Sequence, residues 1–294
     1  MMRKFIGKIL KYLVFGFIII NAVGVLFDFI YVNSVIFKPM IIRRNSANSV
    51  VLGSSRSLTG LNTQIIQNTS SVESRWFNFS IDDTPLETHL IELKLLLKSS
   101  VKLKSVLLQY DRTGVPNEES KLQDRDYQFL PLCYRDYGVL WNYFIKKEQG
   151  FGAALYLLPG LKYIYFNTEL TFPLIKRILL GDYRYRSNDW GDYTYPSLMV
   201  SSKNCKELNE QFLNLKDNTL NEFINLCNQN NIRLYLYVAP FQCESMISDT
   251  LYRNVKIINY SRMFNGDQKY FADDIHINNS AVDSLTNRLV GELN

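Results

Sequence analysis

The sequence predicts an α/β fold in which a parallel sheet is flanked by helices. Short apolar stretches typical of buried strands alternate with stretches whose apolar residues recur at helical spacing. This alternation is found at both ends of the region 45–294. With 294 residues, 47% of them hydrophobic, the chain is long and apolar enough to form one large core.

Residues 1–44 are expected to form a transmembrane anchor followed by a basic neck. Between Lys11 and Asp28 the stretch YLVFGFIIINAVGVLF carries no charge, and with its apolar flanks it has roughly the twenty residues needed to cross a bilayer. A buried soluble helix would not be apolar on every side with lysines gathered at its start. A cleaved signal peptide is disfavoured because no convincing A-x-A site follows.

The distribution of charge along the chain indicates which partners to expect and how the chain is oriented in a membrane. The formal net charge is +5, of which residues 1–44 carry +6 and the rest of the chain −1. No basic stripe remains outside the anchor, so we expect no nucleic-acid partner. Four basic residues precede the apolar span and three follow it, which favours a cytoplasmic N-terminus by a small margin. We therefore expect a single-pass membrane protein with an extracytoplasmic C-terminal domain, residues 45–294.

The first strand is expected over residues 48–53, where the apolar stretch NSVVL ends at a glycine. Leu58, Leu61 and Ile65 then recur at helical spacing. Ser54, Ser55 and Arg56 consequently lie at a junction between a strand and a helix.

A second strand is expected over residues 75–80 and a third over 104–110. The segment between them carries helix-start signals, with Thr84 as the N-cap, Pro85 at the first helical position and Glu87 three residues after the cap. Alternating strands and helices of this kind predict a parallel sheet.

The alternation is interrupted at about residues 115–200, where aromatic clusters such as LYLLPGLKYIYF predict a largely helical insertion. Its aromatic side chains either wall a cleft or pack a small core of their own. The α/β pattern then resumes. A helix is marked by Leu220, Phe223, Ile224 and Cys227, two strands are expected over 232–240 and 254–261, and a last helix over 280–293.

The four cysteines are expected to be free core residues. Their spacing contains no C-x-x-C and no zinc pattern, and their number permits two disulfides without requiring any; they are Cys133, Cys205, Cys227 and Cys243.

The residues best suited to chemistry lie near the two ends of the domain. Functional groups of an open parallel sheet gather at the carboxyl ends of its strands, where Ser55 is expected. Of the two histidines, His89 lies among leucines of a predicted helix and suits a structural role. His276 precedes the last helix and follows Asp273 by three residues. A carboxylate at this spacing can accept Nδ1–H in a turn and leave Nε2 facing a serine.

These residues occur in three blocks that resemble the SGNH (GDSL-type) hydrolase superfamily. The blocks are VVLGSSRSLTGLN at 50–62, FNFSIDD at 77–83 and KYFADDIHINNSA at 269–281. The resemblance is greatest to the membrane-anchored branch that includes the alginate O-acetyltransferase accessory proteins and the D-alanyl-lipoteichoic-acid proteins. It covers the two ends of the domain and not the insertion, and it implies an SGNH/flavodoxin-like three-layer sandwich.

By this resemblance Ser55 is the nucleophile, His276 the base and Asp273 the orienting acid of a membrane-anchored serine esterase or O-acyltransferase. The implied partners are an acyl donor, a carbohydrate acceptor of the cell envelope or an exported polysaccharide, and a membrane-embedded acyltransferase; no cofactor and no metal are implied. The candidates for oxyanion or substrate contacts are Asn78, Asp83, Arg56 and Arg112.

The chain departs from the family pattern at the expected oxyanion hole. Ser54 replaces the aspartate of G-D-S, Ile81-Asp82-Asp83 stands where a glycine N–H is usual, and the G-x-N-D block is absent after the third strand. These departures support an alternative, a non-catalytic SGNH-like protein that binds glycan or scaffolds an envelope-assembly complex. A further alternative, independent of them, is a metal-dependent hydrolase built on Asp273, Asp274 and His276, which needs more ligands than the sequence offers.

Overall fold

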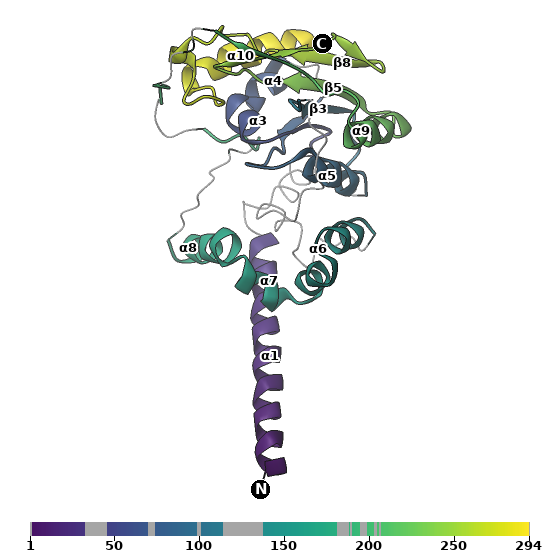
Figure 1. Cartoon of the computed structure of the whole chain (residues 1–294), viewed down its shortest axis with the longest axis vertical. Coiled ribbons are helices and arrows are strands. Elements are labelled where there is room, and N and C mark those ends of the chain that lie inside the picture. Colours follow the sequence, from purple (N-terminus) through teal and green to yellow (C-terminus); the bar gives the residue numbers. More distant parts are fainter. Residues whose placement is uncertain are drawn as a thin grey trace. The chain divides into compact units, whose positions relative to one another are not determined.

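The structure, a computed structural model, describes residues 2–32, 46–69, 74–98, 101–113, 138–180, 188, 190–194, 199–202, 205 and 207–293. The chain forms two compact units. Unit 1 comprises Met1–Met40 and Glu119–Arg184, and unit 2 comprises Ile41–Glu118 and Tyr185–Asn294 (Figure 1). Part of the insertion predicted at about 115–200 therefore belongs to the same unit as the N-terminal helix.

Unit 2 is built on a six-stranded sheet with the order β2-β1-β3-β5-β8-β7. All neighbouring strands are parallel except β7 and β8, which are antiparallel. The strands are β1 (Ser49–Leu52), β2 (Trp76–Asn78), β3 (Ser105–Gln109), β5 (Arg233–Val238), β7 (Leu251–Tyr252) and β8 (Val255–Asn259).

Helices cover both faces of this sheet, because alternate strand residues point to opposite sides and both sides are apolar. Val50 and Leu52 belong to one buried core and Val51 to the other. The first core includes residues of α5 (Leu86–Lys98) and α9 (Asn218–Gln229). The second includes residues of α4 (Thr63–Thr69) and α10 (Asn279–Leu293). The α/β class with a mostly parallel sheet between helices is thus confirmed.

Several details of unit 2 differ from the prediction. The helical segment after β1 is divided into α3 (Ser55–Gly60) and α4. Helix α5 begins at Leu86, one residue later than predicted, and the Thr84 hydroxyl donates to Ile81 O (2.7 Å) rather than capping the helix.

Three short strands, β4, β6 and β7, were not predicted from the sequence. A second, two-stranded parallel sheet pairs β4 (Asn209–Phe212) with β6 (Glu244–Ile247). Strand β4 is mostly exposed and has no apolar alternation. Strand β7 joins β8 through Arg253 and Asn254, both at positive φ, which suits a tight hairpin turn.

Unit 1 is helical in its described part. It contains α1 (Met2–Val32), α6 (Val139–Leu157), α7 (Pro159–Tyr165), the π-helical turn η3 (Asn167–Thr171) and α8 (Phe172–Leu180). Helix α1 is long and apolar enough to cross a membrane, and most of its side chains are exposed. Figure 1 shows α7 lying across α1, with α6 and α8 beside it.

The cysteines are only partly as expected. Cys227 is a buried free thiol of the first core, as predicted, and burial raises its pKa to about 12. Cys205 and Cys243 form a disulfide, so the expectation of free thiols was wrong for this pair. Sequence spacing could not reveal the pairing, because the two residues are 38 positions apart and meet only in the folded chain. Cys133 lies outside the described residues.

Candidate active site

The site forms at the carboxyl end of β1, the strand from which the next two strands are added to opposite sides. From β1 the chain moves to β2 on one side, and β3 then pairs with β1 on the other side. Such a topological switch point leaves a crevice outside the strand ends, where open α/β sheets bind ligands. Ser55 is the first residue of α3, directly beyond this end of β1.

Gln109, the last residue of β3, fixes the turn between β1 and α3. Its Oε1 accepts hydrogen bonds from the backbone N–H of Ser54 (3.2 Å) and Ser57 (3.0 Å) and from Ser57 Oγ (2.7 Å). A Cβ at Gly53 would lie 2.7 Å from Gln109 Cβ, so any larger residue would displace this side chain. The glycine is therefore required for the close approach that orients the residues around Ser55.

Ser55, His276 and Asp273 form a continuous hydrogen-bonded chain. His276 Nε2 is 2.7 Å from Ser55 Oγ, and His276 Nδ1 is 2.8 Å from Asp273 Oδ2. The two ring nitrogens thus face a hydroxyl and a carboxylate. In this arrangement the carboxylate holds the tautomer whose Nε2 can accept the hydroxyl proton.

A tight loop between Phe271 and Ile277 positions the acid and the base. Phe271 and Ile277 form an antiparallel bridge, and Ala272 N–H donates to His276 O (2.8 Å). Asp273 Oδ1 accepts the backbone N–H groups of Ile275 (2.9 Å) and His276 (2.8 Å), which closes the turn. Partial burial alone would raise the pKa of Asp273, but these N–H groups and the His276 side chain outweigh it and hold the pKa below its usual value.

The three side chains lie at the surface of unit 2. The exposed fraction is 15% for the His276 side chain and 52% for Asp273, and Ser55 is half-buried.

Arg56 is a buried cation whose described contacts are all with residues of the fold. Its guanidinium pairs with Asp111, donates to the carbonyls of Ala239 (2.6 Å) and Pro240 (3.0 Å), and lies 3.5 Å from the centre of the Phe241 ring. Burial lowers its pKa, and the neighbouring Asp111 opposes that shift.

The other candidates for oxyanion or substrate contacts are not placed beside Ser55 Oγ by any described hydrogen bond. Asn78 is fully buried, and its amide donates to Ser57 O (2.9 Å) and Asp192 (2.9 Å). Arg112 donates to Glu87 (2.7 Å) and Asp217 (2.8 Å). Asp82 and Asp83 form a turn in which Asp83 has a positive φ.

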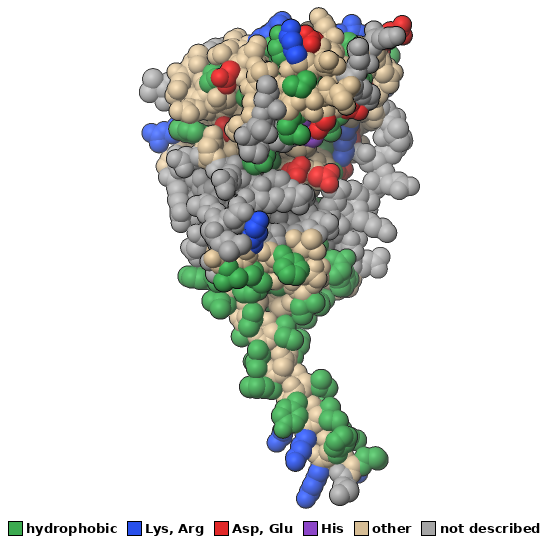
Figure 2. Space-filling model, turned by 90° about the vertical axis from the view of Figure 1, so that its left-hand side faces the viewer, with side chains coloured by type: hydrophobic (Ala, Val, Ile, Leu, Met, Phe, Trp, Pro, Cys, Tyr) green, Lys and Arg blue, Asp and Glu red, His purple; other side chains and the backbone are tan. Residues whose placement is uncertain are grey.

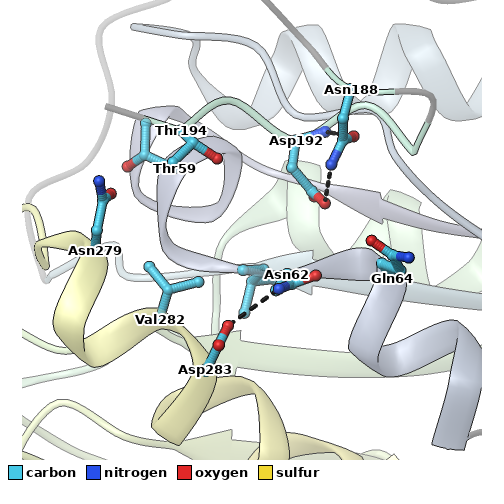
Figure 3. Close-up of a pocket in the computed structure, with 10 residues that line it drawn as sticks. Thr59, Asn62, Gln64, Asn188, Asp192, Thr194, Asn279, Val282 and Asp283 are labelled. Carbon is cyan, nitrogen blue, oxygen red and sulfur yellow. Dashed lines mark hydrogen bonds between the residues drawn. The ribbon is translucent and has the colours of Figure 1, made fainter. Parts of the chain in front are cut away.

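A polar pocket of about 160 Å³ is lined by residues of α3, α4 and α10 and by Asn188, Asp192 and Thr194 (Figure 3). Its lining includes Thr59, one helical turn after Ser55, and Asn279 at the start of α10. The Thr59 hydroxyl donates to Ser55 O (2.9 Å). Most of its lining is polar, with amides and hydroxyls from Asn62, Gln64, Asn188 and Thr194. Groups of this kind both donate and accept hydrogen bonds.

Asp192 is the structural centre of this pocket. It is buried and accepts hydrogen bonds from Thr63 N (2.8 Å), Thr63 Oγ1 (2.6 Å), Asn78 Nδ2 (2.9 Å) and Asn188 Nδ2 (3.3 Å). Burial raises its pKa, although these donors oppose the shift. Its carboxylate ties α4, β2 and the segment around Asn188 together.

His89 has the structural role expected for it. Its ring is buried, Nδ1 is 2.7 Å from Glu92 Oε2, and Nε2 is 3.4 Å from Thr84 Oγ1.

Sequence reasoning missed Gln109 and Asp192. The signal for Gln109 was present, since a polar residue ends the otherwise apolar strand SVLLQ. Asp192 had no such signal, because Thr63 and Asn78, which supply three of its four donors, are distant in sequence.

Comparisons with models of protein families, with curated proteins and with solved structures found no match to this chain. Within the described residues, no group of three or more His, Cys, Asp or Glu side chains is arranged to hold a metal ion.

Proposed function

We propose that the chain is a membrane-anchored serine esterase or O-acyltransferase of SGNH type that acts on a polysaccharide of the cell envelope or on an exported one. The observation that carries this proposal is the 2.7 Å contact between His276 Nε2 and Ser55 Oγ, with Asp273 on the opposite ring nitrogen. A serine, a base within hydrogen-bond reach and an orienting acid are the components of nucleophilic acyl transfer.

The topology of unit 2 supports the SGNH part of the proposal. In chain order its five parallel strands have the arrangement 2-1-3-4-5, an order of doubly wound α/β folds. The serine block follows the first of these strands, and the D-x-x-H block precedes the last helix.

In the first half-reaction, Ser55 Oγ attacks the carbonyl carbon of the acyl donor while His276 Nε2 takes its proton. The tetrahedral intermediate then collapses, and the imidazolium returns the proton to the leaving group. The product is an acyl ester of Ser55. Asp273 stabilises the imidazolium during both proton transfers.

In the second half-reaction, an acceptor hydroxyl gives its proton to His276 and attacks the acyl-serine carbonyl. Ser55 leaves and recovers the proton. Water as acceptor makes the enzyme an esterase, and a sugar hydroxyl makes it a transferase. The polar pocket beside Thr59 and Asn279 supports a sugar acceptor.

The oxyanion hole determines how strong such catalysis is. The backbone N–H of Ser55 is the donor that we assign to the developing charge, because the side chains of Asn78 and Arg112 already donate to other partners. One missing donor costs about 2.7–4 kcal/mol of transition-state stabilisation. This observation favours the second candidate function, a non-catalytic SGNH-like glycan-binding or scaffolding protein.

We further propose that α1 anchors the chain in a membrane with unit 2 on the extracytoplasmic side. Basic residues at the N-terminal end of α1 support a cytoplasmic N-terminus. The Cys205–Cys243 disulfide supports an oxidising compartment for unit 2. A membrane-embedded acyltransferase that delivers the acyl donor is the proposed protein partner.

The proposal is tested by trapping the acyl-enzyme. The full chain in detergent is incubated with p-nitrophenyl acetate as the acyl donor, and the reaction is quenched with acid. The protein is then digested, and the mass of the peptide that contains Ser55 is measured by mass spectrometry. We expect one acetyl group on Ser55, absent in Ser55→Ala and retained in Ser54→Ala, the matched neighbouring serine. If all three proteins remain unmodified while Ser55→Ala still binds glycan, the non-catalytic function replaces the enzymatic one.

A further inference from the structure

Several large hydrophobic side chains of the short helices of unit 1 are exposed, although α6 also carries Lys146, Lys147 and Glu148 and α8 carries Lys176 and Arg177. The most exposed are Leu157, Ile164, Tyr165, Phe172 and Leu179, and each is at least half exposed. In the described part of unit 2, which is the larger unit, only five large hydrophobic residues are exposed. Figure 2 shows exposed hydrophobic side chains along α1 and the helices next to it, with basic side chains at the N-terminal end.

Helix α7 is packed tightly against α1 inside the apolar stretch of α1. The two helices meet at Gly24 and Gly160, where a Cβ on Gly24 would lie 2.5 Å from Gly160 N. A Cβ on Gly160 would lie 2.7 Å from Ile20 O. Small residues that allow such close backbone approach are typical of helix contacts within membranes.

An ion pair is buried between the same two helices. Asp28 of α1 pairs with Lys162 of α7, both side chains are almost completely buried, and Tyr163 donates its hydroxyl to Asp28 (3.0 Å). Charged groups within a bilayer are expensive unless they pair with each other and face protein. The only acidic residue of α1 is thus neutralised by α7.

The contact places α7 at a definite depth along α1. Gly24 is eight residues from Val32, or about 12 Å of helix, while the hydrocarbon core of a bilayer is about 30 Å thick. A membrane-spanning α1 therefore brings α7 into the leaflet at its C-terminal end.

The backbone from α6 to α8 is suited to an apolar solvent. Single residues, Leu158 and Phe166, separate α6 from α7 and α7 from η3, and α8 follows η3 directly. Leu158 N–H donates to Ala154 O (2.9 Å) and Phe166 N–H to Lys162 O (2.8 Å), so both junctions keep their hydrogen bonds. Backbone exposed to lipid must be satisfied internally in this way.

We propose that α6, α7 and α8 are embedded in the leaflet that surrounds the C-terminal end of α1, and that lipid acyl chains cover their exposed apolar side chains. The proposal rests on the anchoring by α1 proposed above. Three observations favour lipid over a protein partner. The apolar surface continues onto α1, Gly24 and Gly160 bring α1 and α7 into close contact, and Lys162 neutralises Asp28.

The test uses three positions whose side chains are equally exposed, at 57%: Ile18 in α1, Ile164 in α7 and Leu251 in unit 2. Each is replaced by cysteine in the full chain with Cys133→Ser, labelled with an environment-sensitive fluorophore and reconstituted into phosphatidylcholine and phosphatidylglycerol liposomes. The liposomes contain lipids with a nitroxide on the acyl chain. Leu179→Cys on α8 provides a second position on the short helices.

We expect loss of fluorescence at Ile18→Cys, Ile164→Cys and Leu179→Cys and none at Leu251→Cys. A nitroxide near the headgroup should quench position 164 more than position 18, because α7 lies in one leaflet. Quenching at position 18 alone overturns the embedding of α6–α8 and leaves the anchor intact. No quenching at position 18 overturns the anchor itself. A blue-shifted but unquenched label at position 164 assigns this surface to a protein partner and also overturns the proposal.

Discussion

His276 Nε2 lies 2.7 Å from Ser55 Oγ, although 221 positions separate the two residues in the chain. The sheet brings them together, because Ser55 follows β1 and the loop that carries His276 precedes α10, which packs on α3 and α4. Two segments with weak local motifs therefore make one arrangement capable of acyl transfer. The predictions below concern this arrangement and the contacts that maintain it.

Ser55 and His276 should act as one unit in the proposed reaction. Ser55→Ala and His276→Ala are each expected to lower kcat by about 10⁴–10⁶. The double variant should be no slower than either single variant, because removal of one member already abolishes the proton transfer. Single-turnover kinetics with a p-nitrophenyl ester measures all three. Multiplicative losses in the double variant would show that the two residues act independently.

Asp273→Asn should preserve the turn but favour the wrong imidazole tautomer. We expect kcat to fall by about 10³–10⁴ with little change in KM, measured with the same ester. A fall of less than about tenfold, which is near 1.4 kcal/mol, would show that the carboxylate does not orient His276.

The ionised Asp273 should also stabilise the fold in a pH-dependent manner. Its folded pKa is below the ordinary value of 3.8, so its stabilisation is complete above that value and disappears as the pH falls through the lower folded pKa. Denaturant unfolding of the wild type and of Asp273→Asn should therefore give a constant difference in free energy at neutral pH and a vanishing one in strong acid. A difference that grows on acidification would contradict this assignment.

Arg56→Met should lower the stability of the fold more than it lowers the rate of the proposed reaction. The substitution leaves the partly buried Asp111 without its cation and the carbonyls of Ala239 and Pro240 without their donor. We expect the free energy of unfolding to fall by about 3–5 kcal/mol. Arg56→Lys should rescue only part of this, because an ammonium cannot reproduce the planar contacts. A normal melting temperature with a raised KM would instead indicate substrate contact.

The Cys205–Cys243 disulfide should contribute measurably to the stability of unit 2. Cys243→Ser is expected to lower the free energy of unfolding by about 2–4 kcal/mol, and a reductant should have a similar effect on the wild type. Cys227→Ser tests the other class of cysteine, since its effect should be independent of reductant. Equal melting curves with and without reductant would show that the bond is not formed.

The main sheet and the helices on its faces were predictable because apolar pattern and helix-start signals depend on neighbouring residues. Strands β1, β3, β5 and β8 lie within the predicted ranges, α9 buries the expected face, and α10 covers the range predicted for the last helix. Strand β4 was not predictable, because its exposed residues are held by pairing with β6 and not by burial of an apolar face.

The site was predictable to a different extent for each residue. The D-x-x-H spacing was sufficient to place Asp273 beside His276, since a short turn decides that contact. The side chains of Arg56 and Asn78 were assigned to substrate or oxyanion contacts because their positions in the chain suited them. Their actual partners, Asp111 and Asp192, come from other segments, and no local pattern predicts such contacts.

The most direct test of the account is fluorophosphonate labelling of the full chain, followed by mass mapping of the modified residue. The account predicts a label on Ser55 that is lost in Ser55→Ala and His276→Ala and retained in Ser54→Ala. A folded protein that remains unlabelled, or that carries the label on another serine, would contradict the claim that His276 activates Ser55.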